Sequence, residues 1–166
     1  MLENQNIICI ANTSWFGKYA KSTVQLLERL AIRNRVLFVE YPYTWKDIYA
    51  TLRGYQQAPT KRMLGIDNRL TEIVTNTGSK VYNLVLPPNL PLFFLKNEAL
   101  FNLFFPLNAC IYKIAVRKAI HKLSFVHPIV ITAYNPIYGN ALVRKFSEKA
   151  HIYYCYDGVE SVFFGK

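Results

Sequence analysis

The segment from Asn6 to Pro42, NIICIANTSWFGKYAKSTVQLLERLAIRNRVLFVEYP, decides the fold. Residues 7–11 and 36–39 are uninterrupted apolar runs, which are typical of strands buried on both faces of a sheet. Between them, apolar residues recur at helical spacing over residues 19–31. Two such strands joined by a helix form a βαβ unit, whose crossover is right-handed in nearly all proteins. Ligands bind at the carboxyl ends of strands in open α/β sheets, so the loop over residues 12–17 is the first candidate site.

The same alternation of strand and helix patterns continues to the end of the chain. We expect strands at residues 70–75, 80–86, 129–133 and 151–156, and helices at 45–52 and 137–150. A further helix starts near Asn97 and is kinked or restarted by Pro106. Residues 55–68 show no period and are interpreted as a surface excursion. The pattern predicts an α/β fold, with a Rossmann-like, open, mostly parallel sheet and helices on both faces, as one domain over residues 1–166. The last residues resemble the opening of a helix, which suggests a fragment of a longer protein.

The excess of positive charge favours anionic partners but does not indicate which kind of anion is bound. Lys and Arg number 20 against 10 Asp and Glu, giving a net charge of +10. Nucleic acid, acidic lipid and phosphorylated substrates all suit this balance, as does a plain solvated surface. The alternative function is therefore a basic α/β binding module for nucleic acid or another anion. No RNP-like, KH-like or helix-turn-helix signature occurs, so nucleic acid is not the expected partner. A flavodoxin-like regulatory domain is disfavoured because the first strand ends in Ala11-Asn12, without an Asp pair.

Cysteine usage predicts a cytoplasmic protein. The three cysteines are scattered and form no CxxC or Cys/His cluster, which suggests reduced, buried thiols. No signal-peptide pattern is present at the start of this sequence.

Residues 91–122 combine aromatic and basic side chains. Residues 99–112 carry no charge, a run that is too short to span a bilayer but long enough to lie in its interface. One interpretation is a core helix whose cationic last turns complement the helix dipole. The other is a helix that meets anionic headgroups of the inner membrane leaflet. The candidate membrane-interface residues are Phe101, Phe104, Phe105, Lys113, Arg117, Lys118 and Lys122.

Three loops are expected to converge at the carboxyl edge of the sheet: residues 12–17, 134–136 and 157–160. Their amides, aromatic rings and carboxylates suit hydroxyl-rich ligands, although Asn and Asp are also ordinary loop-capping residues. Asp157 could accept a proton from a substrate hydroxyl or cap the following helix. The sequence lacks the GxGxxG and GxxxxGK[ST] motifs, so a self-contained nucleotide site is not expected. It also lacks the metal-binding HExxH motif, so a metal centre is not expected, and the GxSxG nucleophile elbow.

Several stretches together resemble one enzyme family. The run NTSWFG from Asn12, the strand RVLFVEYP from Arg35, the strand IVITAYNP from Ile129 and the strand end YDGVE from Tyr156 are similar to the opening of family 4-like GT-B glycosyltransferases. Teichuronic-type cell-envelope enzymes often open this way. One departure is Ser14, where many relatives carry an acidic residue.

This resemblance implies the N-terminal, acceptor-side half of a two-domain enzyme. The nucleotide-sugar donor would bind a C-terminal domain that this chain does not match, so no cofactor is expected here and the isolated fragment is expected to be inactive. The acceptor would be a cell-envelope glycan or a lipid-linked sugar, with the protein cytoplasmic or peripheral on the inner face of the plasma membrane. Asp157 is the candidate catalytic residue. The candidate acceptor-binding residues are Asn12, Ser14, Trp15, Phe16, Gly17, Tyr134, Asn135 and Glu160.

Overall fold

A computed structural model describes residues 2–17, 21–92, 95 and 97–155 of the chain. Its elements in chain order are β1 (Asn6–Ala11), α1 (Ser22–Ala31), β2 (Arg35–Val39), α2 (Trp45–Leu52), α3 (Thr60–Leu64), β3 (Leu70–Val74), β4 (Lys80–Leu84), α4 (Glu98–Leu123), β5 (Ile129–Ala133), α5 (Pro136–Leu142) and β6 (Ala150–Tyr154). The six strands form one sheet in the order β3-β4-β2-β1-β5-β6. Only β3 runs antiparallel to its neighbour, β4.

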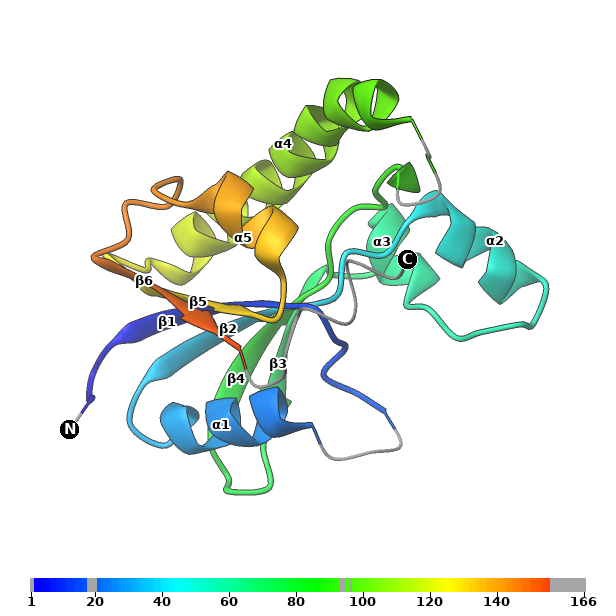
Figure 1. Cartoon of the computed structure of the whole chain (residues 1–166). Coiled ribbons are helices and arrows are strands. Elements are labelled where there is room, and N and C mark those ends of the chain that lie inside the picture. The colour runs from blue at the N-terminus through cyan, green and yellow to red at the C-terminus, as the bar shows by residue number, and fades with distance from the viewer. Residues whose placement is uncertain (1, 18–20, 93–94, 96, 156–166) are drawn as a thin grey trace.

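Helices cover both faces of this sheet, with α1 on one face and α4 and α5 on the other (Figure 1). Successive side chains of a strand point to opposite faces, so β1 serves both layers. Ile7 and Cys9 pack in the layer with Leu27 of α1, whereas Ile8 and Ile10 pack in the layer with α4 and α5. The predicted α/β architecture, a mostly parallel sheet covered on both faces and consistent with a Rossmann-like fold, is confirmed.

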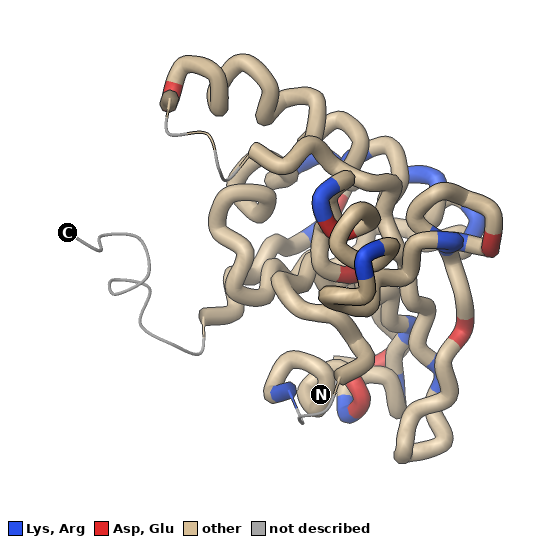
Figure 2. Tube along the Cα trace, turned by 90° about the vertical axis from the view of Figure 1, so that its right-hand side faces the viewer, with Lys and Arg blue, Asp and Glu red and all other residues tan. Residues whose placement is uncertain are grey.

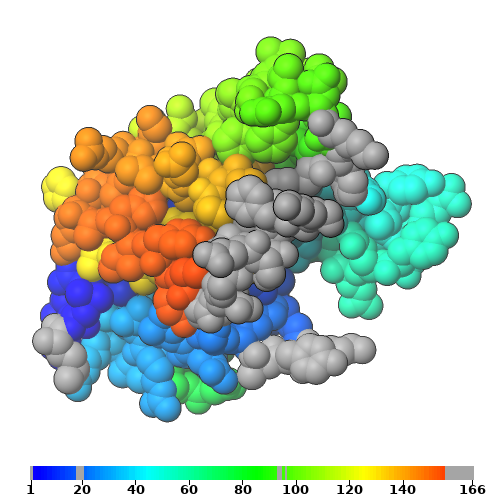
Figure 3. Space-filling model, in the orientation of Figure 1, coloured from blue at the N-terminus to red at the C-terminus, as the bar shows by residue number. Residues whose placement is uncertain are grey.

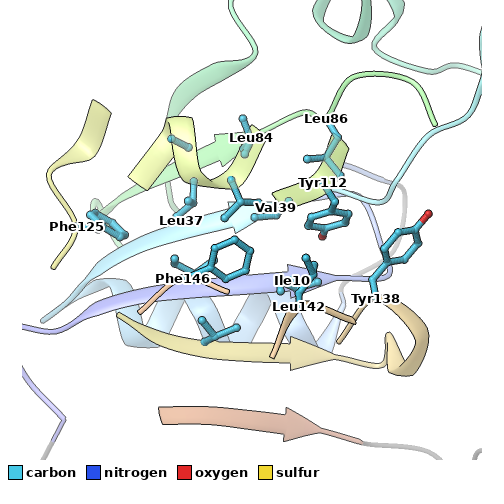
Figure 4. Close-up of a cluster of buried hydrophobic side chains, with 14 residues drawn as sticks. Ile10, Leu37, Val39, Leu84, Leu86, Tyr112, Phe125, Tyr138, Leu142 and Phe146 are labelled. Carbon is cyan, nitrogen blue, oxygen red and sulfur yellow. The ribbon is translucent and has the colours of Figure 1, made fainter. Parts of the chain in front are cut away.

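The core under α4 is large and aromatic. Figure 4 shows Tyr112 of α4 and Tyr138 of α5 close together above the sheet, beside Ile10 of β1. The two tyrosine ring centroids lie 5.2 Å apart. Both rings are almost fully buried, so this contact fixes the C-terminal half of α4 against the sheet.

The structure corrects three expectations about elements. Residues 55–68 contain the short helix α3, whose five residues are too few to show a helical period. The helix after β5 ends at Leu142, because Val143 takes an extended conformation and a turn follows, so the chain enters β6 already at Ala150. Finally, of the two alternatives predicted at Pro106, the restart is wrong, because α4 runs as one helix from Glu98 to Leu123 with Pro106 inside it.

Two of the three cysteines also differ from expectation. Cys9 is buried in β1, where loss of solvation raises the pKa of its thiol. Cys110 lies on the outer side of α4 and Cys155 directly after β6, and both are exposed. The prediction of buried thiols is therefore wrong for these two positions.

Candidate functional site

The carboxyl ends of the parallel strands β1, β2, β4, β5 and β6 lie along one edge of the sheet. The chain builds outwards from β1 to β2 and β4 on one side, and then to β5 and β6 on the other. Such a reversal of strand order is the usual location of a ligand site in open α/β sheets. The reversal lies between β1 and β5, and the loop after β1 is therefore the first place to look for a cavity along this edge.

A cavity of about 380 Å³ lies at the ends of β1, β2 and β4, beside α3. Its volume falls within the range of roughly 300–1,000 Å³ that is usual for small-molecule sites. It is lined by Ser14, Phe16, Gly17, Glu40, Tyr43, Gln57, Ala58, Pro59, Arg62 and Val85. We call this space the Glu40 cavity, because Glu40 is the one carboxylate among the described residues that line it.

Glu40 follows β2 directly and is only 2% exposed. Its main-chain N–H donates to the carbonyl of Leu84 at 2.9 Å, which extends the pairing of β2 with β4. Its Oε1 accepts two hydrogen bonds, from the main-chain N–H of Trp15 at 3.1 Å and from Nδ2 of Asn83 at 2.7 Å. Its Oε2 is buried and has no hydrogen-bond partner within the part of the chain that the structure describes. A buried carboxylate oxygen that lacks a donor is costly, so a ligand that donates a hydrogen bond to this atom would relieve that cost.

The two cations beside Glu40 are committed to main-chain oxygens. Arg62 donates from Nη2 to the carbonyls of Arg69 and Asn83, at 2.8 and 3.0 Å, and from Nε to that of Asn68 at 3.2 Å. Burial lowers the pKa of Arg62, and the negative charge of Glu40 opposes that shift.

Lys21 plays the same part in the loop after β1. Its Nζ donates to the carbonyls of Ser14 and Phe16, the latter at 2.8 Å. Burial lowers the pKa of Lys21 and the charge of Glu40 again opposes the shift. Both cations therefore hold loops in place around the carboxylate.

Tyr43 supplies an aromatic wall and a hydroxyl. Its ring packs edge-on against Tyr41, with the centroids 5.3 Å apart. Burial raises the pKa of Tyr43, and a hydrogen bond with the side chain of Ser14 opposes this rise. Phe16 lies at the rim with 61% of its surface exposed, so its ring is available to a ligand.

Of the sequence-predicted site residues, the structure brings Ser14, Phe16 and Gly17 together around the Glu40 cavity. Trp15 does not line the cavity, because its indole ring packs edge-on against Phe38 of the core, with centroids 5.1 Å apart. Its contribution to the site is the main-chain N–H that binds Glu40.

The other predicted residues lie elsewhere along the edge. Asn12 is exposed, and its main-chain N–H donates to the carbonyl of Ala133 at 3.2 Å. Asn135 is buried and caps α5 through a hydrogen bond from the N–H of Tyr138, and neither it nor Tyr134 lines the Glu40 cavity. Asp157 and Glu160 fall outside the described residues.

Sequence reasoning missed Glu40, Tyr43 and Arg62. Glu40 carried a usable signal, because it directly follows an apolar strand, as Asp157 follows the predicted strand at residues 151–156. Arg62 carried no such signal, because the sequence did not predict α3. The contact of Arg62 with the sheet edge depends on the path of the chain through residues 55–68.

The N-terminal half of α4 forms a second notable surface. It projects from the body of the molecule (Figures 1 and 3) and exposes Leu100, Leu103, Phe104 and Leu107. Phe101 stacks on Phe105 at 5.4 Å, and Phe105 in turn packs against Tyr138, so these two rings face inwards. We call the four exposed residues the α4 apolar tip.

Basic residues follow this tip along the same helix (Figure 2). Arg117, Lys118 and Lys122 are exposed and Lys113 is half-buried, while Nε of Arg117 donates to the carbonyl of Lys145. By length and composition alone, α4 qualifies as a candidate membrane-spanning helix. The sequence analysis considered only the uncharged run at residues 99–112, which is too short to span a bilayer. Tyr112, Val116 and Ala119 are nevertheless buried in the core, as in a helix of a soluble domain.

Comparisons of the sequence with protein-family models and with curated proteins give no match. Among the described residues, no group of three or more His, Cys, Asp or Glu side chains could hold a metal ion. The described residues that line the Glu40 cavity offer a buried carboxylate, a guanidinium, a side-chain amide, hydroxyl groups and aromatic rings, in a space large enough for a small ring-shaped ligand.

Proposed function

We propose that this chain is the acceptor-binding domain of a GT-B glycosyltransferase, which moves a sugar from a nucleotide-sugar donor to a cell-envelope glycan or lipid-linked acceptor. The observation that supports this most is the Glu40 cavity at the carboxyl edge of the mostly parallel sheet. A buried carboxylate beside hydroxyl groups and an exposed aromatic ring is a lining suited to sugar hydroxyls and sugar faces. The nucleotide sugar would be held by a second domain of the complete enzyme.

The test is sugar transfer by the complete reading frame, using a panel of nucleotide sugars and lipid extracts as acceptors. Phe16→Ala should lower transfer by raising the KM for the acceptor, and should leave the affinity for the nucleotide sugar unchanged. Phe16 is the right position because its ring is exposed at the rim, so truncation leaves the core intact. Exposed Tyr55, outside the cavity lining, provides the control Tyr55→Ala. Absence of transfer with every donor, or equal effects of both variants on acceptor and donor, would contradict the proposal.

We also propose that the α4 apolar tip and the lysines that follow it dock the protein on an anionic membrane surface. Exposed apolar side chains can enter the interface, and each nearby basic residue adds about 1 kcal/mol of attraction to anionic lipid. Lys118 and Lys122 are exposed and lie one turn apart on α4, which suits one common surface. This arrangement would hold the acceptor site close to lipid-linked substrates.

Vesicle co-sedimentation tests the docking surface. Lys118→Glu/Lys122→Glu should weaken binding to phosphatidylglycerol-containing vesicles by roughly tenfold or more. Lys46→Glu/Lys61→Glu, which makes the same change in charge at exposed residues of α2 and α3, should bind nearly as the wild type does. Equal partitioning of all three proteins would refute the docking surface.

A further inference from the structure

The Glu40 cavity differs in character from the rest of this basic chain. The chain carries a net charge of +10, which by itself favours anionic ligands. Arg62, which lines the cavity, and Lys21 in the loop beside it already donate to main-chain carbonyls, whereas Oε2 of Glu40 has no hydrogen-bond partner among the described residues. A phosphate or carboxylate ligand in the cavity would meet the negative charge of Glu40, and like charges brought together at a binding site weaken binding.

We propose that the Glu40 cavity selects a neutral, hydroxyl-bearing ring, and that Oε2 of Glu40 is the specificity-determining atom that accepts a hydrogen bond from one ligand hydroxyl. This inference rests on the proposed function in taking that ring to be a sugar of the acceptor. Hydrogen bonds between a hydroxyl and a carboxylate are short and strong. A ligand hydroxyl would thus supply the donor that Glu40 lacks in the free protein.

The local framework holds the carboxylate ready for such a ligand. Glu40 follows β2 and pairs with β4 through its main chain, so its position is set by the sheet. Its Oε1 is fixed by donors from two other segments, Trp15 in the loop after β1 and Asn83 in β4. Because both donors hold Oε1, Oε2 is the carboxylate oxygen left without a partner in the described part of the chain and is the one that a ligand could engage.

The aromatic lining completes the preference for a ring. Phe16 and Tyr43 line the same cavity, and the exposed face of Phe16 can cover the apolar face of a pyranose. Tyr43 and Ser14 also line the cavity with Glu40, and their hydroxyl groups provide further polar contacts for a ligand. A sugar in this position would meet one strong acceptor and one aromatic surface.

The experiment is a titration of the full-length protein with two sets of probes. Binding is detected from changes in the ¹⁵N-edited NMR spectrum. The neutral set contains methyl glycosides of glucose, galactose, mannose and N-acetylglucosamine, and the anionic set contains inorganic phosphate and methyl glucuronide. At least one neutral glycoside should shift the main-chain amide signal of Trp15 and the side-chain amide signals of Asn83, because both donate to Glu40. Phosphate should leave these signals in place.

Glu40→Gln is the decisive variant, because the amide keeps an acceptor for Trp15 and Asn83 and replaces only Oε2. It should lower the affinity for the glycoside by roughly tenfold or more, since a hydrogen bond to a charged group is lost. Glu72→Gln, at an exposed carboxylate that pairs with Lys80, is the matched control and should not change the affinity. If Glu40→Gln does not fold, Phe16→Ala should still weaken glycoside binding, because its ring lies at the rim.

The outcomes separate this inference from the proposed function. Equal glycoside affinity in wild type and Glu40→Gln, or binding of phosphate in place of neutral glycosides, would overturn the inference even if the complete enzyme transfers sugar. Glu40-dependent glycoside binding in a complete protein that transfers no sugar would support the inference and overturn the proposed function.

Discussion

The hydrogen bond between Asn83 and Glu40 should be the most sensitive point of the candidate site. Asn83 is fully buried, and its Nδ2 donates to Oε1 of Glu40 at 2.7 Å. Hydrogen bonds to a charged group contribute about 1.5–3 kcal/mol, so Asn83→Ala should destabilise the fold by roughly 3 kcal/mol once the lost packing is included. A domain of this size loses about 2–4 °C in Tm per kcal/mol, which predicts a fall of roughly 6–12 °C. The measurement is urea or thermal unfolding followed by circular dichroism.

A double-mutant cycle shows whether the charge of Glu40 is the cause. Glu40→Gln removes the buried charge, so Asn83→Ala should cost about 1–2 kcal/mol less in that background than in the wild type. Asn102→Ala, at an exposed position of α4, should change the free energy of unfolding by less than about 0.5 kcal/mol. Additive effects of the two substitutions would refute the argument that Asn83 stabilises a buried carboxylate.

Three further predictions concern the framework. Asn97→Ala should lower stability by about 1 kcal/mol in urea unfolding, because the Asn97 side chain caps α4. Gly139→Ala should cost roughly 1–3 kcal/mol, since a Cβ there would lie 2.5 Å from Cγ2 of Thr132, whereas Asn140→Ala at the exposed next position should be neutral. Burial raises the pKa of Glu148, but hydrogen bonds, chiefly from main-chain N–H groups, outweigh it and hold the pKa below 4.5. The stabilisation from Glu148 is therefore present above pH 4.5 and lost as the pH falls through its lower folded pKa, and an acid titration of Glu148→Gln should lack this loss.

The sheet could be predicted from the sequence because its signal is local. The apolar run of β1 and its alternation between two faces require only neighbouring residues, and Ile8 and Ile10 indeed pack on the face opposite Ile7. The end of α5 could not be predicted in this way. Phe146 fits the helical spacing and is buried as expected, but it reaches the core from a turn whose N–H groups bind the side chain of Glu148.

The candidate site shows the same division between local and distant causes. The loop after β1 was identified because the ends of the strands follow from the pattern, and Ser14, Phe16 and Gly17 line the cavity. Trp15 packs inwards because it contacts Phe38 of β2. The sequence of the loop alone could not show whether the Trp15 ring faces a ligand or the core. The role of Arg62 depends on a helix too short to produce a periodic signal.

The most direct test of the central claim is a crystal structure of the protein soaked with the methyl glycoside that binds best. We predict a sugar ring in the Glu40 cavity, against Phe16 and Tyr43, with one hydroxyl oxygen about 2.5–3.0 Å from Oε2 of Glu40. A ring bound at another surface, or in the cavity with no hydroxyl within hydrogen-bond distance of Glu40, would contradict it.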